Sequence, residues 1–171
     1  GSVANRTQIV CLCEGKKGGS IDEVFINRLI RCLNPSWIRQ SQSGSNLLRI
    51  KSCGGRTQVI NQMPLELKNC LAAGAETTLM VWADLDHDKA DGDALKADFW
   101  KEAQRIGITR DQFDQTVFIF PKDRLENWIQ FLQTGSTNEC EEAPRIKHTK
   151  DVAKAAKELA DRCKSGGTLS N

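Results

Sequence analysis

The segments IVCLCEG, residues 9–15, and LMVWADLD, residues 79–86, are apolar runs that each end in carboxylates. Continuous apolar runs are typical of strands that are buried on both faces, as in a parallel sheet. In open α/β sheets, ligands bind beyond the carboxyl ends of the strands, where Glu14, Asp84 and Asp86 would lie. The two segments therefore predict a parallel α/β sheet with three acids gathered at one edge.

Strands and helices alternate along the rest of the chain. Two more strands are predicted at 47–51 and 116–120. Helices with an apolar face are predicted at 20–33, 65–73, 94–106, 122–132 and 151–164. The alternation predicts an α/β fold, a Rossmannoid three-layer sandwich whose mostly parallel sheet has about four strands.

Local residues set the expected helix boundaries. Ser20 and Glu23 fit a capping box at the start of the first helix. Pro35 ends that helix, because the residue before a proline is pushed out of the α region. We expect the second helix to follow Pro64 and to carry Leu65 on its apolar face.

The length of the chain predicts one domain over residues 1–171. A chain of 171 residues with 39% hydrophobic and 27% charged residues is enough for one core and leaves no room for a second catalytic domain. We expect a core at about 7–132, a polar loop at 135–144 and a C-terminal amphipathic helix at about 149–164.

Composition restricts the class of protein. The net charge of +2 is far from the strongly basic balance that by itself indicates a nucleic-acid binder, so charge does not identify the partner. Seven cysteines are an odd count without a zinc-ligand spacing, which favours reduced, mostly buried thiols in a cytoplasmic protein. No apolar run approaches the roughly 18 residues of a membrane span, and no signal peptide is recognisable, so no membrane partner is expected.

The acids at the strand ends predict a metal site. Glu14, Asp84 and Asp86 supply hard oxygen ligands, which Mg²⁺ prefers, and Mn²⁺ is a suitable substitute. Alternation along a strand places Asp84 and Asp86 on the same side. Clustered carboxylates repel one another, and a cation allows all three to stay ionised. For Asp88, Asp91 and Asp93 a loop or helix-capping role is weighted evenly with a role in the site.

Two other phosphate or metal motifs are excluded. Asp84, Asp86 and Asp88 resemble the start of an EF-hand calcium loop, but Lys89 stands where that loop needs glycine and Leu95 where it needs glutamate. The Gly/Lys-rich loop after Glu14 lacks the Gly-Lys-Ser/Thr of a P-loop, so nothing predicts ATP hydrolysis.

Four motifs together resemble a Toprim domain over about residues 7–132. They are the strand followed by Glu14-Gly15, the acidic helix start Asp22-Glu23, the Asp84-x-Asp86 pair, and the segment KDRLENW at 122–128. Toprim domains occur in topoisomerases, primases, OLD-family nucleases and small RNA-maturation nucleases, and share Mg²⁺-dependent phosphoryl transfer on nucleic acid. The resemblance is closest to small stand-alone and OLD-like nuclease domains.

The resemblance implies roles for individual residues. Glu14 would hold metal or act as general acid and base, and Asp84 and Asp86 would bind metal. Asp22 is the preferred ligand of a second metal, because Glu23 is assigned to the capping box. Lys122 or Arg124 would lie near the scissile phosphate and stabilise its developing charge.

The chain also departs from the family pattern. The loop between Gly15 and Asp22 is longer than in the family, and the acidic run continues past Asp86. Both departures bear on the second metal position.

The missing residue types narrow the expected function. The chain contains no tyrosine, the nucleophile with which a topoisomerase holds a broken strand, so strand passage by this chain alone is excluded. The remaining chemistry is metal-dependent hydrolysis of phosphodiesters in DNA or RNA, with a protein partner such as an ATPase, in genome defence or nucleic-acid processing. Two alternatives stay open: a non-catalytic Toprim-like binding or regulatory module, and a small-molecule phosphoesterase.

Overall fold

The computed structural model describes residues 6–17, 20–44, 46–74, 76–86, 88–122, 124–137, 146 and 148–164. Within these segments one sheet has the strand order β2-β1-β3-β4, and every neighbouring pair is parallel. The strands are β1 (Gln8–Cys13), β2 (Leu48–Ser52), β3 (Thr77–Trp82) and β4 (Val117–Ile119). The predicted α/β class and four-stranded sheet are therefore confirmed, and the described sheet is parallel throughout.

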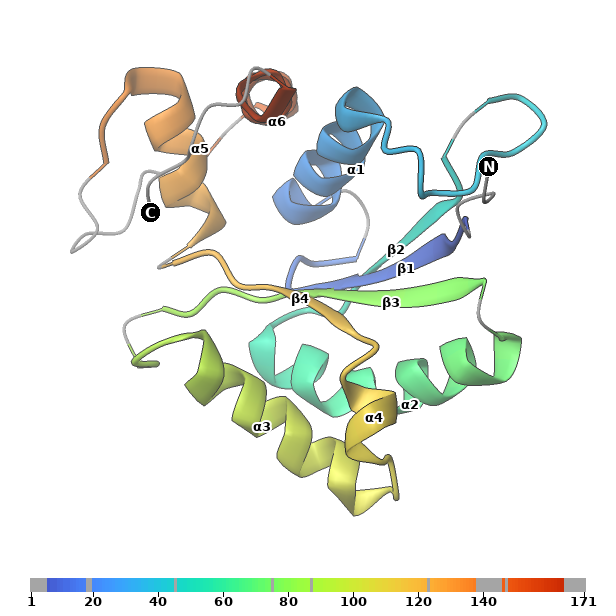
Figure 1. The fold of residues 1–171 in the computed structure, drawn as a ribbon. Coiled ribbons are helices and arrows are strands. Elements are labelled where there is room, and N and C mark those ends of the chain that lie inside the picture. Colours follow the sequence, from blue (N-terminus) through green and yellow to red (C-terminus); the bar gives the residue numbers. More distant parts are fainter. Residues whose placement is uncertain are drawn as a thin grey trace.

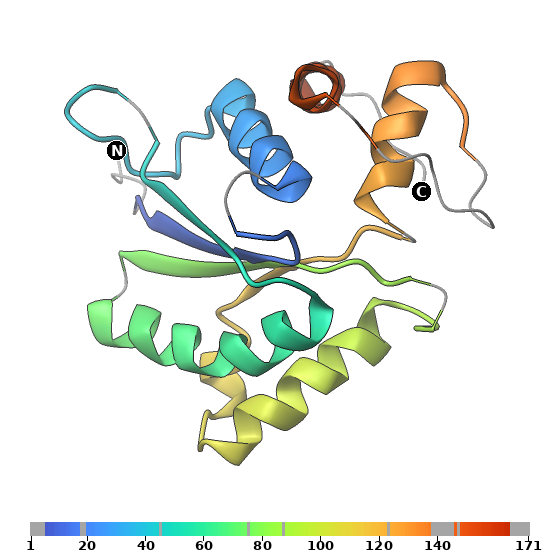
Figure 2. The same ribbon diagram turned by 180° about the vertical axis from the view of Figure 1, so that it is seen from behind.

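Helices cover both faces of the sheet and make the three layers of a Rossmann-like sandwich (Figures 1 and 2). One face carries α1 (Ile21–Leu33), α5 (Leu125–Thr134) and α6 (Thr149–Lys164). The other face carries α2 (Arg56–Ala73), α3 (Gly92–Arg105) and the short α4 (Arg110–Phe113). None of the helices in the described segments is long and apolar enough to cross a membrane.

The central strand β1 is buried on both faces, as its apolar run predicts. Cys11 and Cys13 face the α1 side and Leu12 faces the α2 side, and all three side chains are fully buried. The described cysteines are free; Cys11, Cys13, Cys53 and Cys70 are buried, Cys32 is half-buried and Cys163 is exposed. The prediction of mostly buried thiols is confirmed for these residues, with Cys163 as the exposed exception.

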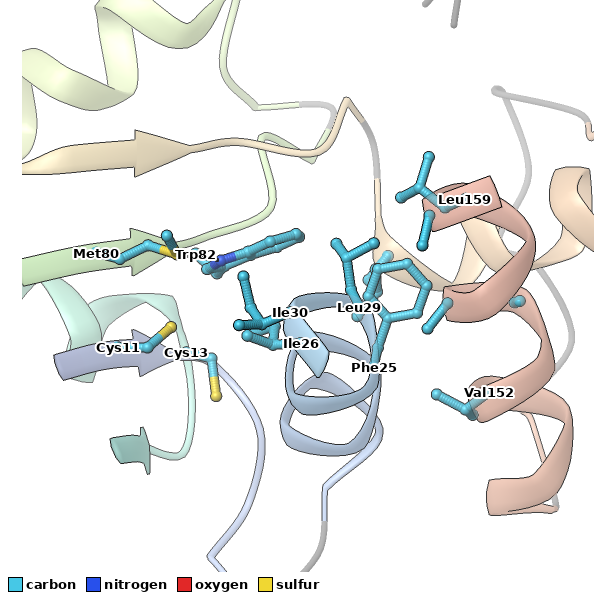
Figure 3. Packing of buried hydrophobic residues seen from close by; sticks show 14 of the residues in the cluster. Cys11, Cys13, Phe25, Ile26, Leu29, Ile30, Met80, Trp82, Val152 and Leu159 are labelled. Atoms are coloured by element: carbon cyan, nitrogen blue, oxygen red, sulfur yellow. Dashed lines mark hydrogen bonds between the residues drawn. The ribbon is translucent and has the colours of Figure 1, made fainter. Parts of the chain in front are cut away.

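On the face of the sheet that carries α1, α5 and α6, helix α1 lies between the sheet and α6 (Figure 3). Ile26 and Ile30 pack toward the strands, near Trp82, and α6 adds Val152 and Leu159 to the same apolar cluster. Small residues of α6, Ala155, Ala156 and Ala160, are also buried there. The C-terminal helix therefore shares its core with the first helix of the chain.

The second helix differs from the sequence prediction. It begins at Arg56, eight residues before Pro64, and Pro64 lies buried inside it. A proline inside a helix costs about 3 kcal/mol because it removes one hydrogen bond and crowds the preceding turn. Burial of Val59, Met63 and Leu67 against the sheet offsets that cost. Because the apolar face runs through these residues, Leu65 is exposed, contrary to the prediction.

Smaller differences concern the second half of the chain. The helix predicted from residue 122 begins at Leu125, with Arg124 at its N-cap. Helix α4 was not predicted, and a capping box between Thr109 and Gln112 stabilises its single turn. Most of the predicted polar loop at 135–144 lies outside the described residues, which end at 137 and resume at 146.

Candidate functional site

The ends of β1 and β3 bring Glu14 and Asp84 together. The strands are parallel neighbours, with Leu12 opposite Val81, so the residues that follow them leave the sheet at the same edge. Glu14 Oε2 accepts a hydrogen bond of 2.6 Å from the backbone N–H of Asp84. Two acids that are 70 residues apart in the sequence are thus in direct contact, as the strand-end pattern predicts.

Asp84 lies at the centre of the acidic group. Its carboxylate Oδ1 accepts a hydrogen bond of 3.2 Å from the backbone N–H of Leu125, at the start of α5. The pKa of Asp84 is raised to about 9, first by burial and then by the negative charges of Glu14, Asp22 and Glu126, in that order. The side chain is therefore desolvated and surrounded by other acids.

Glu14 and Asp22 share this environment. Burial is the main cause that raises the pKa of Glu14 to about 7; the hydrogen bond from Asp84 N–H opposes it, and Asp22 and Asp86 add to it. Burial, followed by the charge of Glu126, raises the pKa of Asp22 to about 6. Glu126, in the first turn of α5, belongs to the motif at 122–128, whose resemblance implies that it orients its neighbours or pairs with Arg124, and its charge adds to the acidic group.

Glycine at position 15 allows the start of α1 to approach β1. A Cβ atom there would lie 2.0 Å from Ser20 Oγ and 3.0 Å from Asp22 Oδ2, so no larger residue fits without movement. Ser20 caps α1 by accepting a hydrogen bond from Glu23 N–H. The Glu23 carboxylate accepts a hydrogen bond from Ser52 Oγ at 3.1 Å, so only the Ser20 half of the predicted capping box is seen among the described contacts.

We predict that Gly15→Ala lowers the free energy of unfolding by about 1–3 kcal/mol, the usual cost of overpacking. The new methyl group displaces Ser20, and with it the helix start that carries Asp22. Urea unfolding monitored by circular dichroism measures the change. The double variant Gly15→Ala/Ser20→Gly should regain part of the lost stability, since it removes the Oγ and Cβ atoms of Ser20, which lie nearest the new methyl group. An equal loss of stability in both variants would contradict this explanation.

Asp86 is held by two arginines. Arg124 Nε donates a hydrogen bond of 3.1 Å to Asp86 Oδ1, and Arg56 Nη1 lies 3.7 Å from Asp86 Oδ2. The backbone of Asp86 is left-handed, with φ of 52°, a conformation that is uncommon for residues other than glycine. Lys122, the other predicted cation, is exposed.

The sequence prediction missed Arg56. Its guanidinium donates hydrogen bonds to the carbonyl oxygens of Asp84 and Leu85, at 3.3 and 2.9 Å, and pairs with Asp88. The signal in the sequence is the Gly54-Gly55 turn that places Arg56 directly after β2. Among the acids left open by the sequence, Asp88 binds Arg56, and Asp91 caps α3 by accepting a hydrogen bond from Ala94 N–H.

The donor atoms of the site suit a hard cation. Glu14, Asp22, Asp84 and Asp86 offer carboxylate oxygens, and burial, followed by the charges of neighbouring acids, raises the pKa of the first three. In the described residues, no three His, Cys, Asp or Glu side chains are already arranged to ligate one ion. Binding would therefore require side chains to turn, and Asp86 would leave at least one of its arginines.

Comparison of the chain with protein-family models, curated proteins and solved structures found no match. The geometry of the site is therefore the basis for a functional proposal.

Proposed function

We propose that the protein is a cytoplasmic, metal-dependent nuclease that hydrolyses phosphodiester bonds in DNA or RNA. The observation that carries the proposal is the gathering of desolvated carboxylates, with two arginines, at the carboxyl edge of β1 and β3. A nuclease needs both charges there, because acids bind the cation and a cation such as Arg124 binds phosphate. The resemblance to Toprim domains adds Mg²⁺-dependent chemistry on nucleic acid to this argument.

The residues present have separate roles in the proposed reaction. Asp84, Asp86 and Asp22 would hold Mg²⁺ or Mn²⁺, which supplies Lewis-acid stabilisation and a more acidic bound water. Glu14 has a pKa of about 7 and therefore can accept and return a proton near neutral pH. Arg124, released from Asp86, or the exposed Lys122 would neutralise the phosphate.

A cleavage assay tests the proposal. Labelled single- and double-stranded DNA and RNA are incubated with the protein in Mg²⁺, Mn²⁺ or EDTA, beside Asp84→Ala/Asp86→Ala. We expect cleavage of at least one polymer with either metal, and none in EDTA or with the double variant. Cleavage that the double variant retains would indicate a contaminating nuclease and contradict the proposal. A mononucleotide tested in parallel identifies a small-molecule phosphoesterase, which would hydrolyse it and leave polymers intact.

A second candidate is a non-catalytic binding or regulatory module. The observation that favours it is the pairing of Asp86 with Arg56 and Arg124, which supplies positive charge without a metal. Such a module would bind its partner, for example an ATPase, equally well in EDTA, and would show no cleavage in the assay.

A further inference from the structure

Beyond the end of β3, the chain is no longer paired with the neighbouring strand β1. The pairing of β3 with β1 extends to Leu12 and Val81, after which the chain of β1 ends its strand at Cys13. On its other side, the chain beyond β3 keeps backbone contacts: Ala83 N–H donates to Ile119 O, and Leu85 N–H donates to Pro121 O at 3.0 Å. Backbone groups thus hold the segment at 83–86 on the β4 side, while on the β1 side the Glu14 carboxylate accepts a hydrogen bond from Asp84 N–H.

Arg56 supplies hydrogen-bond donors to the carbonyl oxygens of this segment. Its Nη1 donates to the carbonyl oxygens of Asp84 and Leu85, at 3.3 and 2.9 Å. The same guanidinium forms a two-pronged pair with Asp88 and lies 3.7 Å from Asp86. One side chain thus contacts three residues of the segment that carries two of the candidate metal ligands, and Asp88 just beyond it.

The position of Arg56 is itself fixed by its surroundings. Gly54, with φ of 97°, turns the chain sharply after β2, and its N–H donates to Gly15 O at 2.9 Å. Arg56 is the first residue of α2, so its backbone is part of an 18-residue helix packed on the sheet. Only 19% of its side chain is exposed. The guanidinium therefore approaches the segment after β3 from a rigid base.

We propose that Arg56 is a positioning residue, which fixes the backbone after β3 so that Asp84 and Asp86 stay opposite Glu14. This inference rests on the proposed function for its catalytic consequence. The fork of the guanidinium is essential, because its two terminal nitrogens bind both carbonyls and both oxygens of the Asp88 carboxylate, whereas a lysine ammonium carries the same charge on one nitrogen with fewer donors. A role in charge neutralisation alone would be met by lysine equally well.

The first test needs neither metal nor nucleic acid. Amide hydrogen exchange is measured for Asp84 and Leu85 in the wild type, Arg56→Ala and Arg56→Lys, with Arg105→Ala as control. Arg105 is an exposed arginine paired with Glu102 on α3. We expect both Arg56 variants to exchange these amides about tenfold faster or more, since the segment opens locally, and the control to match the wild type. Wild-type exchange in Arg56→Lys would overturn the role of the fork.

The second test follows the consequence for the site. Both Arg56 variants should bind Mn²⁺ about 10- to 100-fold more weakly by calorimetry, the usual effect of losing a group that orients ligands. They should also lower kcat by a similar factor with KM for nucleic acid little changed. A variant that raises only KM would show that Arg56 contacts the substrate and would overturn the positioning role. If the wild type cleaves nothing, the proposed function fails, while exchange and Mn²⁺ affinity still decide the inference.

Discussion

Asp84→Asn is expected to lower metal-dependent cleavage by about a thousandfold or more, because it removes a ligand from a cation that contributes several kcal/mol to the transition state. Asparagine has nearly the same shape, and its side-chain oxygen still accepts the hydrogen bond from Leu125 N–H. The fold should therefore persist, and single-turnover cleavage measures the loss directly.

The same substitution should stabilise the protein when no cation is present. The carboxyl group of Asp84 is buried among other acids, and its pKa of about 9 records the cost of ionising it there. A neutral amide avoids this cost, so in EDTA at pH 8 we expect the melting temperature to rise by about 5 °C. Saturating Mg²⁺ should stabilise the wild type by about 3 kcal/mol at a hundred times its dissociation constant and should stabilise the variant far less.

A matched control separates the loss of the buried metal ligand Asp84 from the loss of a negative charge anywhere on the protein. Asp161→Asn makes the same chemical change on α6, where Asp161 is half exposed and pairs with Lys157. It should leave cleavage unchanged and alter stability by less than about 1 kcal/mol. Cleavage by Asp84→Asn at more than a tenth of the wild-type rate would refute the role of Asp84 as a ligand.

Without a cation, the protein is expected to lose stability as pH rises from about 4 to about 9. In the folded state the pKa values of Asp22, Glu14 and Asp84 are raised to about 6, 7 and 9. In the unfolded chain these acids titrate near a pKa of about 4. The folded state therefore binds more protons in this window, and its stability, complete below pH 4, falls as pH rises through the folded values.

The expected fall is at least about 3 kcal/mol, or roughly 10 °C or more in melting temperature, between pH 5 and pH 9 in EDTA. Saturating Mg²⁺ should flatten the profile, since the cation binds the ionised acids and replaces their protons. The double variant Glu14→Gln/Asp84→Asn should also flatten it in EDTA. Thermal unfolding across this pH range measures all three profiles, and stability that rises with pH in EDTA would show that the acids are not desolvated as described.

The sequence predicts best where local pattern and burial agree. The apolar runs at 9–13 and 79–83 predict strands with two buried faces, and the structure buries both. Because parallel strands end at one edge, the contact between Glu14 and Asp84 follows from the strands alone. The role of each acid remains a prediction that the cleavage and binding experiments decide.

The sequence predicts least where a contact depends on tertiary packing. Arg56 is 28 and 29 residues from the carbonyls that it binds; the Gly54-Gly55 turn signals its place after β2, but no local pattern indicates which groups it contacts. Pro64 signals a helix start by its local preference, but burial of the helix face overrides it. Glu126 joins the acids because α5 begins beside Asp84, which its own helical pattern does not reveal.

The wide separation of the site residues along the chain has a consequence for folding kinetics. The hydrogen bond from Asp84 to Glu14 closes a loop of 70 residues, and the hydrogen bond from Leu125 to Asp84 closes a loop of 41 residues. Such contacts form late, because the entropy of closing long loops must be overcome first. A ligand that needs all of these residues would bind only after the folding transition state. It would therefore slow unfolding and leave the folding rate unchanged, so the occupied site would protect the protein kinetically.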